Sequence, residues 1–437
     1  MNMVHIIEKK RNGRSLTTAE INWFVQNYTA DTIPDYQAAA LLMAIYFQGM
    51  NRRETADLTL ALAQSGDQLD LHDALPKGTV IVDKHSSGGV GDKTTLVVQP
   101  LVAACGIPVG KMSGRGLGAS GGTLDKMEAI QGWSGQLPLT QFKQQLADIG
   151  LVLAGQTADL APADGKLYAL RDVTGTVAST PLIAASIMSK KLAGGADAIL
   201  LDVKTGSGAF MPTVEAAQAL ARQMVAIGHE AGRQTVALIS DMNQPLGHAI
   251  GNALEVKEAI ATLQGNGPDD FWAHCLEVAA HMVQLAGQTA DLDEAKEMVT
   301  AVRSNGQGWA KFKQMVAAQG GDLTQLEQPD QLPQAKLVEP IPAPRSGTIA
   351  TMNTSAIGWA AVHLGAGRQA KGDNIDHSVG FVLTTKVGDT LETGQALGQI
   401  HANDAAKLAE ARQQLLDALT WADTAVAPLP HFYGTIG

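Results

Sequence analysis

Two segments rich in glycine and hydroxyl side chains could bind a phosphate group. The first, VDKHSSGGVGDKTTLVV at residues 82–98, brings together Lys84, His85 and two serines ahead of three glycines. Glycine lets the backbone approach a ligand closely, and the free N–H groups of a helix that begins after the loop attract an anion. The segment has neither the spacing of a P-loop nor that of a GxGxxG dinucleotide fingerprint. It therefore predicts an anion site of another kind, with lysine and serine side chains as further donors.

A second segment of this kind lies about thirty residues further on, within Lys111–Glu128. Between Ser113 and Thr123 it contains five glycines and Arg115. A stretch so poor in side chains is unsuited to packing in a core. Two such loops, each expected at the end of a strand or the start of a helix, strengthen the prediction of an anion site.

A third cluster could bind a polar ligand in a cleft. Tyr168, Arg171 and Asp172 precede a helix that Pro181 helps to start, and on this helix Ser186 and Lys190 are four residues apart. Residues at that spacing share one face. The helix is otherwise apolar, so we expect the serine and the lysine to point into a cleft. The neighbouring Lys191 is instead predicted to be a solvated residue.

The composition excludes several classes of function. The formal net charge of −11 argues against binding to nucleic acid or to an anionic membrane surface, so an anion site must be built locally. Only Cys105 and Cys275 occur, both in apolar surroundings, and no disulfide framework is expected. The longest apolar run, 38–47, is too short to cross a bilayer, and the N-terminus lacks the apolar core of a signal peptide. We expect a cytoplasmic protein.

The first 66 residues predict helices that carry few catalytic side chains. Capping boxes are expected at Thr17–Glu20 and at Asn51–Glu54. Another helix should run from Pro34 to Gly49, and the helix after Asn51 should end at Gly66. We interpret this part as scaffold or subunit interface.

The middle of the chain alternates short apolar runs with helical patterns. Residues 80–82, 198–203 and 235–239 are predicted strands with helices between them, which is typical of a largely parallel sheet covered by helices. Ligands of such sheets bind beyond the carboxyl ends of the strands, where the glycine loops would fall.

The composition changes near residue 340. Pro340–Pro344 is predicted to be a stiff linker, and the segment after it is rich in glycine, threonine and valine, which predicts a small β-rich module. The module lacks a lysine at a hairpin tip between methionines, so a role as a biotinyl or lipoyl carrier is not favoured.

Seven strings in this sequence resemble the pyrimidine-nucleoside phosphorylases, the family that includes thymidine phosphorylase. They are KHSSGGVGD, KMSGRGLGASGGTLDKME, LYALRDVTGTV, ASIMSKKLA, DVKTGSGAFM, PLGHAIGNALEVKEAI and GAGRQAKGDNIDHSVG. The similarity runs nearly end to end, and the second string is close to a family signature.

The resemblance implies an α/β protein with a small all-helical lobe, a larger α/β lobe with a central, largely parallel sheet, and a C-terminal β-rich module. The expected helical lobe is 1–66, joined in space by about 160–194. The α/β phosphate-binding domain would consist of 78–155 and 195–335, and the β-rich module of 345–437. A homodimer whose two lobes close around the substrates is expected.

The implied activity is the reversible phosphorolysis of pyrimidine nucleosides to free base and pentose 1-phosphate. By resemblance, the residues that hold phosphate are Lys84, Ser86, Thr95, Ser113 and Thr123. The residues implied to hold the base are Arg171, Ser186 and Lys190, with Leu117 and Tyr168 lining the pocket. Cationic Arg171 and Lys190 would stabilise negative charge on the departing base, and His85 would deliver a proton or a hydrogen bond to it.

Members of the family that accept both uridine and thymidine tend to carry lysine where this chain has Lys111, so uridine, 2′-deoxyuridine and thymidine are the expected substrates. Phosphate is a co-substrate, and the chemistry requires no cofactor. Some relatives bind a monovalent cation, which would place K⁺ near Gly88 and Glu255 here. One departure stands out: Ala119–Ser120 replaces the usual His-Thr, which could alter activity or base preference.

Three alternatives stay open at this point. One is a phosphorylase restricted to thymidine. Another is a phosphoribosyltransferase of similar architecture, such as anthranilate phosphoribosyltransferase, although Arg171, Ser186 and Lys190 would then lack a purpose. The last is a protein that binds nucleoside or phosphate without turnover.

Overall fold

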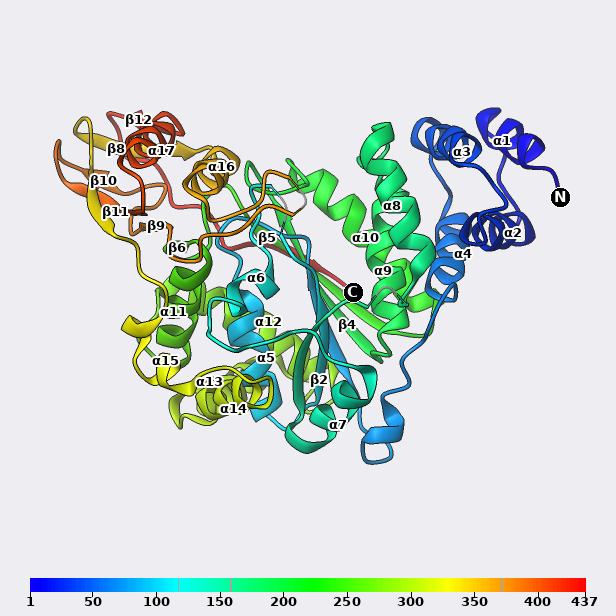
Figure 1. Ribbon diagram of the computed structural model, residues 1–437, viewed down its shortest axis with the longest axis horizontal. Coiled ribbons are helices and arrows are strands. Elements are labelled where there is room, and N and C mark those ends of the chain that lie inside the picture. The colour runs from blue at the N-terminus through cyan, green and yellow to red at the C-terminus, as the bar shows by residue number, and fades with distance from the viewer. Residues whose placement is uncertain (117, 158, 371) are drawn as a thin grey trace.

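The computed structural model describes residues 1–116, 118–157, 159–370 and 372–437 of the chain. A helical lobe lies at one end, an α/β lobe in the middle and a strand-rich C-terminal module at the other end (Figure 1). The predicted fold class is therefore confirmed. Within these described ranges, no helix has the length and apolar character needed to cross a membrane.

The outer part of the helical lobe consists of α1 (Met3–Arg11), α2 (Thr18–Thr29), α3 (Asp35–Gln48) and α4 (Arg52–Ala63). Both predicted capping boxes are present, at Thr17 with Glu20 and at Asn51 with Glu54. Helix α4 ends at Ala63, before the predicted Gly66. The chain turns there toward the next helix of the lobe, where Ser65 Oγ accepts a hydrogen bond of 3.1 Å from the backbone N–H of Ala163.

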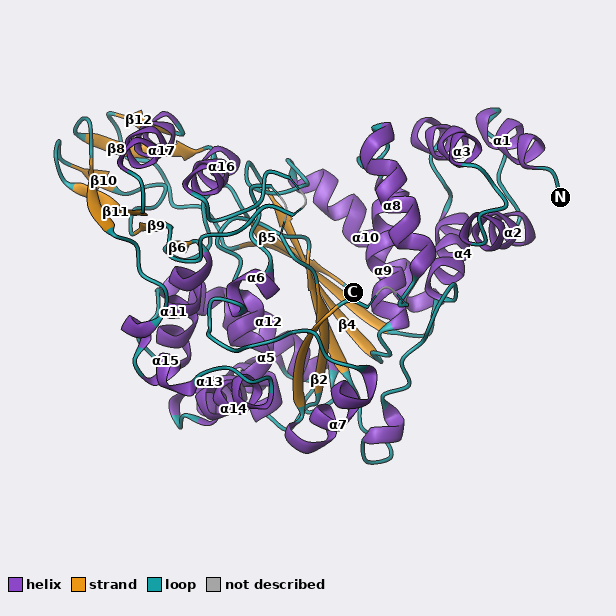
Figure 2. Cartoon of the chain, viewed as in Figure 1, coloured by secondary structure: helices purple, strands orange, loops and turns teal. Residues whose placement is uncertain are grey.

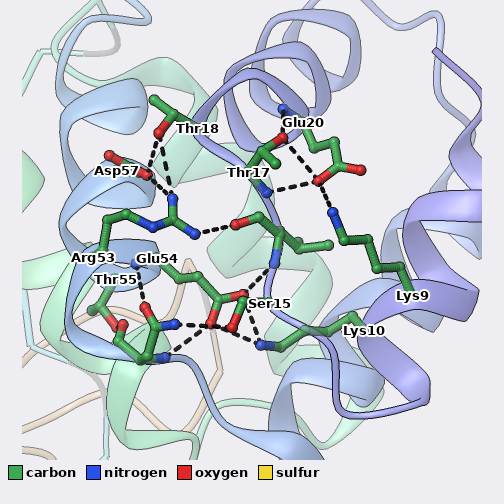
Figure 3. Close-up of polar contacts among 12 residues, drawn as sticks. Lys9, Lys10, Ser15, Thr17, Thr18, Glu20, Arg53, Glu54, Thr55 and Asp57 are labelled. Carbon is green, nitrogen blue, oxygen red and sulfur yellow. Dashed lines mark hydrogen bonds and ion pairs between the residues drawn. The ribbon is translucent and has the colours of Figure 1, made fainter.

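Two ion pairs, one of them buried, join the two capping boxes to the first helix (Figure 3). Lys10 Nζ donates to both carboxylate oxygens of Glu54, at 2.8 and 3.0 Å, and the backbone N–H of Leu16 donates to the same carboxylate at 2.7 Å. Lys9 in turn donates to Glu20 at 2.7 Å. The capping glutamates therefore hold α1 against α2 and α4 as well as starting their own helices.

Two later helices complete this lobe, namely α8 (Pro162–Thr174) and α9 (Thr180–Ala193). They lie between α1–α4 and the sheet in Figure 1. Leu167 of α8 and Leu182 of α9 belong to the same buried apolar cluster as Phe24, Leu41 and Leu58 of the N-terminal helices. Residues far apart in sequence thus share one core.

The main sheet has the strand order β1 (Val82–Ser86), β4 (Ala198–Thr205), β5 (Gln234–Asp241) and β13 (Phe432–Ile436). The first three strands are parallel and β13 is antiparallel to β5. A second parallel pair consists of β2 (Val109–Ser113) and β3 (Leu151–Gly155). Lys111 on β2 donates to the carbonyl oxygen of Lys84 on β1 at 2.5 Å, so this pair lies beside β1.

Helices cover both faces of this sheet (Figure 2). Alternation along the buried strands separates two apolar clusters. Leu200 and Leu238 join the cluster that includes α5 (Thr94–Ala104) and α12 (Asp269–Leu285), whereas Ile199 and Leu201 join the cluster with α9 and α10 (Val214–Glu230). The other helices of the α/β lobe are α6 (Thr123–Met127), α7 (Leu139–Ile149), α11 (Asn252–Leu263), α13 (Leu292–Ser304), α14 (Gln307–Ala318) and α15 (Leu323–Glu327), with short 3₁₀ turns at η1 (His72–Ala74) and η2 (Pro329–Gln331).

The C-terminal module contains two small sheets. One has the order β10 (Thr390–Leu391), β8 (Gly347–Met352) and β12 (Leu419–Ala422), and the other β6 (Ala249–Ile250), β9 (Gly380–Leu383), β11 (Ala396–Ala402) and β7 (Leu337–Pro342). Helices α16 (Thr354–Leu364) and α17 (Ala405–Asp417) pack with them. Strand β6 comes from the α/β part of the sequence and β13 returns to the main sheet, so the module is joined to that lobe at two places.

The prediction that Pro340–Pro344 is a linker is wrong, because Leu337–Pro342 forms strand β7. Pro340 pairs with Gln399 of β11, and β7 stands at the edge of its sheet. An edge strand tolerates proline because one side needs no backbone donor.

Candidate active site

Strand β1 carries the first candidate side chains. The sequence predicted a strand that ended at Val82, but the ladder with β4 continues from Val82 to Ser86 and pairs Lys84 with Leu200 and Ser86 with Asp202. The backbone ladder with β4 carries the strand through these polar residues. The glycine loop proper then runs from 87 to 93, and α5 begins at Thr94.

A buried charge cluster lies at this end of β1 and β4. Asp202 accepts from Lys204 at 2.7 Å and from Ser240 at 2.5 Å, and His274 Nε2 lies 3.0 Å from it. Burial alone would raise the pKa of Asp202, but Lys204 and His274 bring that pKa far below its ordinary value. Asp202 is therefore ionised and already well supplied with donors.

Lys84 stands out in this cluster. Its side chain is completely buried, and its ammonium group lies 3.7 Å from Asp202, beyond hydrogen-bond distance. Among the described residues, Lys84 Nζ has no hydrogen-bond partner. Because buried N–H donors without an acceptor are costly, this ammonium needs an acceptor, which an anion bound beyond the strand would supply.

The other predicted phosphate ligands lie around the same end of the sheet. Ser86 Oγ donates to the carboxylate of Asp92 and accepts from the backbone N–H of Gly88 at 3.2 Å. Thr95 is nearly buried in the first turn of α5. Half-buried Ser113 is the last residue of β2, and half-buried Thr123 is the first residue of α6. The two glycine-rich segments thus lie at the ends of the neighbouring strands β1 and β2, and the sequence predicts such a position.

Arg115 of the second loop is held in place by hydrogen bonds to two acidic residues. Arg115 donates to both oxygens of Glu128 and, at 3.3 Å, to Asp125. Asp125 also accepts from the backbone N–H of Gly116 at 2.7 Å and from Arg368 of the C-terminal module at 2.9 Å. These contacts fix the loop and occupy the guanidinium of Arg115. The predicted pocket residue Leu117, in the same loop, lies outside the described residues.

The unusual Ala119 packs against the C-terminal module. A Cβ atom added at Gly358 of α16 would lie 2.7 Å from the carbonyl oxygen of Ala119 and 3.0 Å from its Cβ. Helix α16 therefore approaches the loop closely at Ala119, where the resemblance implies a histidine. The small Ala119 side chain is matched to that approach.

The predicted Ser186 and Lys190 face is present on α9. Lys190 Nζ donates to Ser186 Oγ at 3.1 Å, and both side chains contact one carboxylate oxygen of Asp164 on α8, at 2.5 Å from Lys190 and 3.0 Å from Ser186. Asp164 is not among the site residues predicted from the sequence. Its spacing could have revealed it, because Asp164, Tyr168 and Arg171 are four and three residues apart and hence share one face of α8.

Arg171 is buried and anchors the segment between α8 and α9. Its guanidinium donates to the carbonyl oxygens of Val177 at 2.7 Å and Leu182 at 3.1 Å, and Arg171 Nε donates to Thr176 at 3.4 Å. The guanidinium also lies 5.5 Å from the ring centroid of Tyr168, whose side chain is about half exposed. Arg171 and Tyr168 are thus arranged beside Lys190's carboxylate partner Asp164 on one helix.

The prediction that Lys191 is solvated is wrong. Its side chain is buried and donates to Asp83 of β1 at 2.7 Å. Lys111 approaches the other oxygen of Asp83 at 3.7 Å. The sequence pattern concealed this pair because the partners are 108 residues apart.

His85 lies half-buried among these cations. Burial is the main cause of a pKa well below the ordinary value of 6.5, and Lys191, Lys111 and Lys84 lower it further. The imidazole is consequently neutral at neutral pH. A neutral imidazole can donate one hydrogen bond and accept another.

Glu255, one of the two residues near which K⁺ was expected, already has a cationic partner. The Glu255 carboxylate pairs with the ammonium of Lys126 at 2.9 Å and accepts from the backbone N–H of Gly251 at 3.1 Å. Lys126 also donates to the carbonyl oxygen of Asp92, which precedes α5, at 2.8 Å. A lysine therefore already supplies the positive charge between Glu255 and the first glycine loop.

Comparisons with known proteins find three family matches along the chain. Residues 4–66 match the helical bundle domain of a glycosyl transferase family, and residues 78–309 match the a/b domain of that family. Residues 348–422 match the pyrimidine nucleoside phosphorylase C-terminal domain.

Comparisons over the full length of the chain agree with these family matches. Pyrimidine-nucleoside phosphorylases from Staphylococcus aureus strains N315 and MSSA476 are each 53% identical over 428 residues, which is 98% of either chain. The crystal structure of anthranilate phosphoribosyltransferase from Thermus thermophilus superposes with a TM-score of 0.59 at 18% identity, over 72% of this chain and 98% of that one. The latter likeness concerns the fold alone.

Proposed function

The chain belongs to the pyrimidine-nucleoside phosphorylase family and is a pentosyltransferase, and from this premise we propose that it catalyses the reversible phosphorolysis of uridine, 2′-deoxyuridine and thymidine. In this reaction an oxygen of phosphate attacks C1′ of the sugar, and the electron pair of the C1′–N1 bond leaves with the base. The products are a pentose 1-phosphate and the free pyrimidine.

The fully buried Lys84 ammonium, which has no hydrogen-bond partner among the described residues, carries the proposal for the phosphate site. Inorganic phosphate would satisfy it, with further hydrogen bonds from Ser86, Thr95, Ser113 and Thr123. Hydrogen bonds to a charged acceptor are about twice as strong as those between neutral groups. The already ionised Asp202 behind Lys84 would limit the net positive charge that the site presents to phosphate.

The base would bind on the helical lobe. Lys190 and Ser186 share the carboxylate of Asp164 at 2.5 and 3.0 Å, and Arg171 lies on the same helix as that aspartate. Negative charge that grows on the exocyclic oxygens of the departing pyrimidine would be stabilised by Lys190 and Arg171. Neutral His85 would donate a hydrogen bond to the base, rather than act as an imidazolium acid at neutral pH.

Lys111 is proposed to recognise the 2′-hydroxyl group of ribose. Its ammonium group donates to the carbonyl oxygen of Lys84 and lies 3.7 Å from the carboxylate of Asp83, and both residues belong to β1. A remaining N–H could donate to a ribose 2′-hydroxyl, which a thioether cannot do. Lys111→Met should then lower kcat/KM for uridine about two- to tenfold more than for 2′-deoxyuridine, since a net hydrogen bond contributes roughly 0.5–1.5 kcal/mol. Equal losses on both nucleosides would assign the residue a structural role only.

Two further proposals concern assembly and motion. Exposed apolar side chains gather on the outer surface of α3, including Tyr36 and Phe47 at 74% and 75% exposure, and we propose that this surface joins two copies of the chain.

Because the base would sit on the helical lobe and phosphate on the sheet, the lobes would close to bring them together at C1′. Solution scattering with both ligands should show a compaction that neither ligand causes alone, and unchanged scattering would oppose the closure.

The experiment that tests the function is incubation with uridine and thymidine, with and without inorganic phosphate, while free base is measured. We expect base release only with phosphate. Equal release in phosphate-free buffer would identify a hydrolase. No release in either buffer would contradict an enzyme that acts on nucleosides. Release of uracil from uridine 5′-monophosphate with pyrophosphate and magnesium would then identify a phosphoribosyltransferase, and its absence a binding protein. Ser113→Ala should raise the KM for phosphate more than the KM for nucleoside.

A further inference from the structure

A completely buried lysine beside the phosphate loop occupies a cage of oxygen atoms. Lys93 immediately precedes α5, and its side chain has no exposed surface. The Lys93 ammonium lies among four oxygens: the carbonyl oxygens of Gly91 at 3.0 Å, Leu246 at 2.7 Å and Ala249 at 3.2 Å, and a carboxylate oxygen of Glu258 at 2.5 Å. The ring centroid of Phe271 lies 4.7 Å away on a further side.

This set of ligands exceeds what a lysine needs. An ammonium group has three N–H donors, whereas four oxygens approach it, so at least one contact is purely electrostatic. Three backbone carbonyls and a single carboxylate are instead the surroundings that a bare monovalent cation requires, since carbonyl oxygens replace the hydration shell of K⁺ in proteins. The cage carries one negative charge, which one ammonium balances.

The cage is also closed by its own backbone. Gly247 lies between Leu246 and Ala249, whose carbonyl oxygens accept from Lys93, and has a φ of +65°. A Cβ added there would come within 2.8 Å of Lys93 Nζ and 2.1 Å of Glu258. The Glu258 carboxylate further accepts from the backbone N–H groups of His248 and Ala249. Glycine is therefore required at 247, and the segment 246–249 is shaped around the charge.

The position of the cage links it to the proposed phosphate site. Gly91 belongs to the loop that follows Ser86, while Leu246 and Ala249 belong to the segment that leads into β6 and pairs with the C-terminal module. The backbone N–H of Leu246 also donates to the carbonyl oxygen of Val90 at 3.2 Å. A positive charge in the cage thus holds the loop 87–93 to the segment 246–249.

We propose that Lys93 is a built-in replacement for a free monovalent cation. Its ammonium group locks the loop 87–93 in place, so the protein needs no K⁺, and removal of the Lys93 side chain converts the cage into a K⁺ site. Lys93 is a positioning residue in this proposal. The inference rests on the cage geometry and stands whichever nucleoside the enzyme cleaves.

The test compares thermal unfolding of the full chain in KCl and in choline chloride at equal ionic strength. For the unaltered protein we expect the same Tm in both salts. Lys93→Ala should melt several degrees lower in choline chloride, and its Tm should rise with the concentration of K⁺, as expected for a ligand that binds only the folded state. Isothermal titration of Lys93→Ala with KCl should find one site per chain, and titration of the unaltered protein none.

Two control variants separate the cage from other effects. Lys93→Met fills the space without a charge and should stay destabilised in both salts. Lys126→Ala removes the other buried lysine near this loop, which pairs with Glu255, and should not gain stability from K⁺. A K⁺-dependent Tm of the unaltered protein would overturn the proposal even if no variant folds. So would rescue of Lys126→Ala instead of Lys93→Ala, because the cation would then belong beside Glu255.

Discussion

Lys191 and Asp83 form a buried ion pair between helix α9 and strand β1, with 2.7 Å between the ammonium nitrogen and a carboxylate oxygen. Helix α9 carries Ser186 and Lys190, and β1 carries Lys84, His85 and Ser86. The pair therefore connects the element proposed to hold the base with the strand proposed to hold phosphate.

Lys191→Ala should lower the free energy of unfolding by about 3–5 kcal/mol, because removal of one partner leaves a buried carboxylate without its main counter-charge. Lys111 still faces Asp83, so the lower end of this range is expected. Chemical denaturation measures the loss. The control is Lys143→Ala, whose partially exposed pair with Asp73 at 3.8 Å should contribute at most about 1 kcal/mol. Equal stability of the two variants would show that the α9 anchor is not a stabilising contact.

Lys190→Ala should reduce turnover about 10²–10³-fold, the usual effect of removing one preorganised group that stabilises developing negative charge. Arg171→Ala should fall in the same range, and His85→Ala should lose less because its role is a single hydrogen bond. Steady-state kinetics on a folded variant, checked by circular dichroism, measures the effect. Lys313→Ala on the distant α14 is the control. Near-normal turnover of Lys190→Ala would make that lysine a partner of Asp164 and nothing more.

The stability of the protein should depend on pH through Lys111. Burial, and then the charge of Lys191, lower the pKa of Lys111 from 10.5 to about 7. Between these two values the unfolded chain binds more protons at this residue than the folded chain does, so its contribution to the free energy of unfolding rises with pH. The difference in that free energy between the unaltered protein and Lys111→Met should therefore increase from about pH 7 to about pH 9.5. A constant difference would contradict the lowered pKa.

Phe47→Asp should shift the protein toward monomers, because it places a charge within the exposed apolar surface of α3 proposed to join two copies. Sedimentation velocity measures the change. Val338→Asp, at an exposed apolar position on β7 that pairs with β11 of the C-terminal module, is the matched control and should leave the assembly unchanged. A monomeric unaltered protein would refute the proposed dimer.

Local signals predicted much of the fold. The capping boxes at Thr17 and Asn51 depend on residues three positions apart, and the short apolar runs of β4 and β5 depend on immediate neighbours, so both could be recognised in the sequence. The pairing of β13 with β5 could not, because an edge strand adds to a sheet through backbone hydrogen bonds that leave no sequence pattern. The extension of β1 through Lys84 and His85 was missed because polar residues argue against a buried strand.

Some features of the candidate site could likewise be predicted from the sequence, and others could not. The glycine loops and the spacing of Ser186 and Lys190 are visible in the sequence because their chemistry and period are local. The burial of Lys191 and Lys93 could not be predicted from the sequence, since a buried lysine differs from a solvated one only by its partners. Those partners lie 108 residues away for Lys191 and 153 residues away for the carbonyl of Leu246 that Lys93 contacts. Only the fold brings these charges together.

The most direct test of the central claim follows the phosphorus atom. The enzyme is incubated with uridine and radiolabelled inorganic phosphate, and both uracil and labelled ribose 1-phosphate are quantified over time. Phosphorolysis at the proposed site predicts one labelled ribose 1-phosphate for each uracil released, with both products lost together in Lys190→Ala. Uracil released alongside unlabelled free ribose would contradict the account.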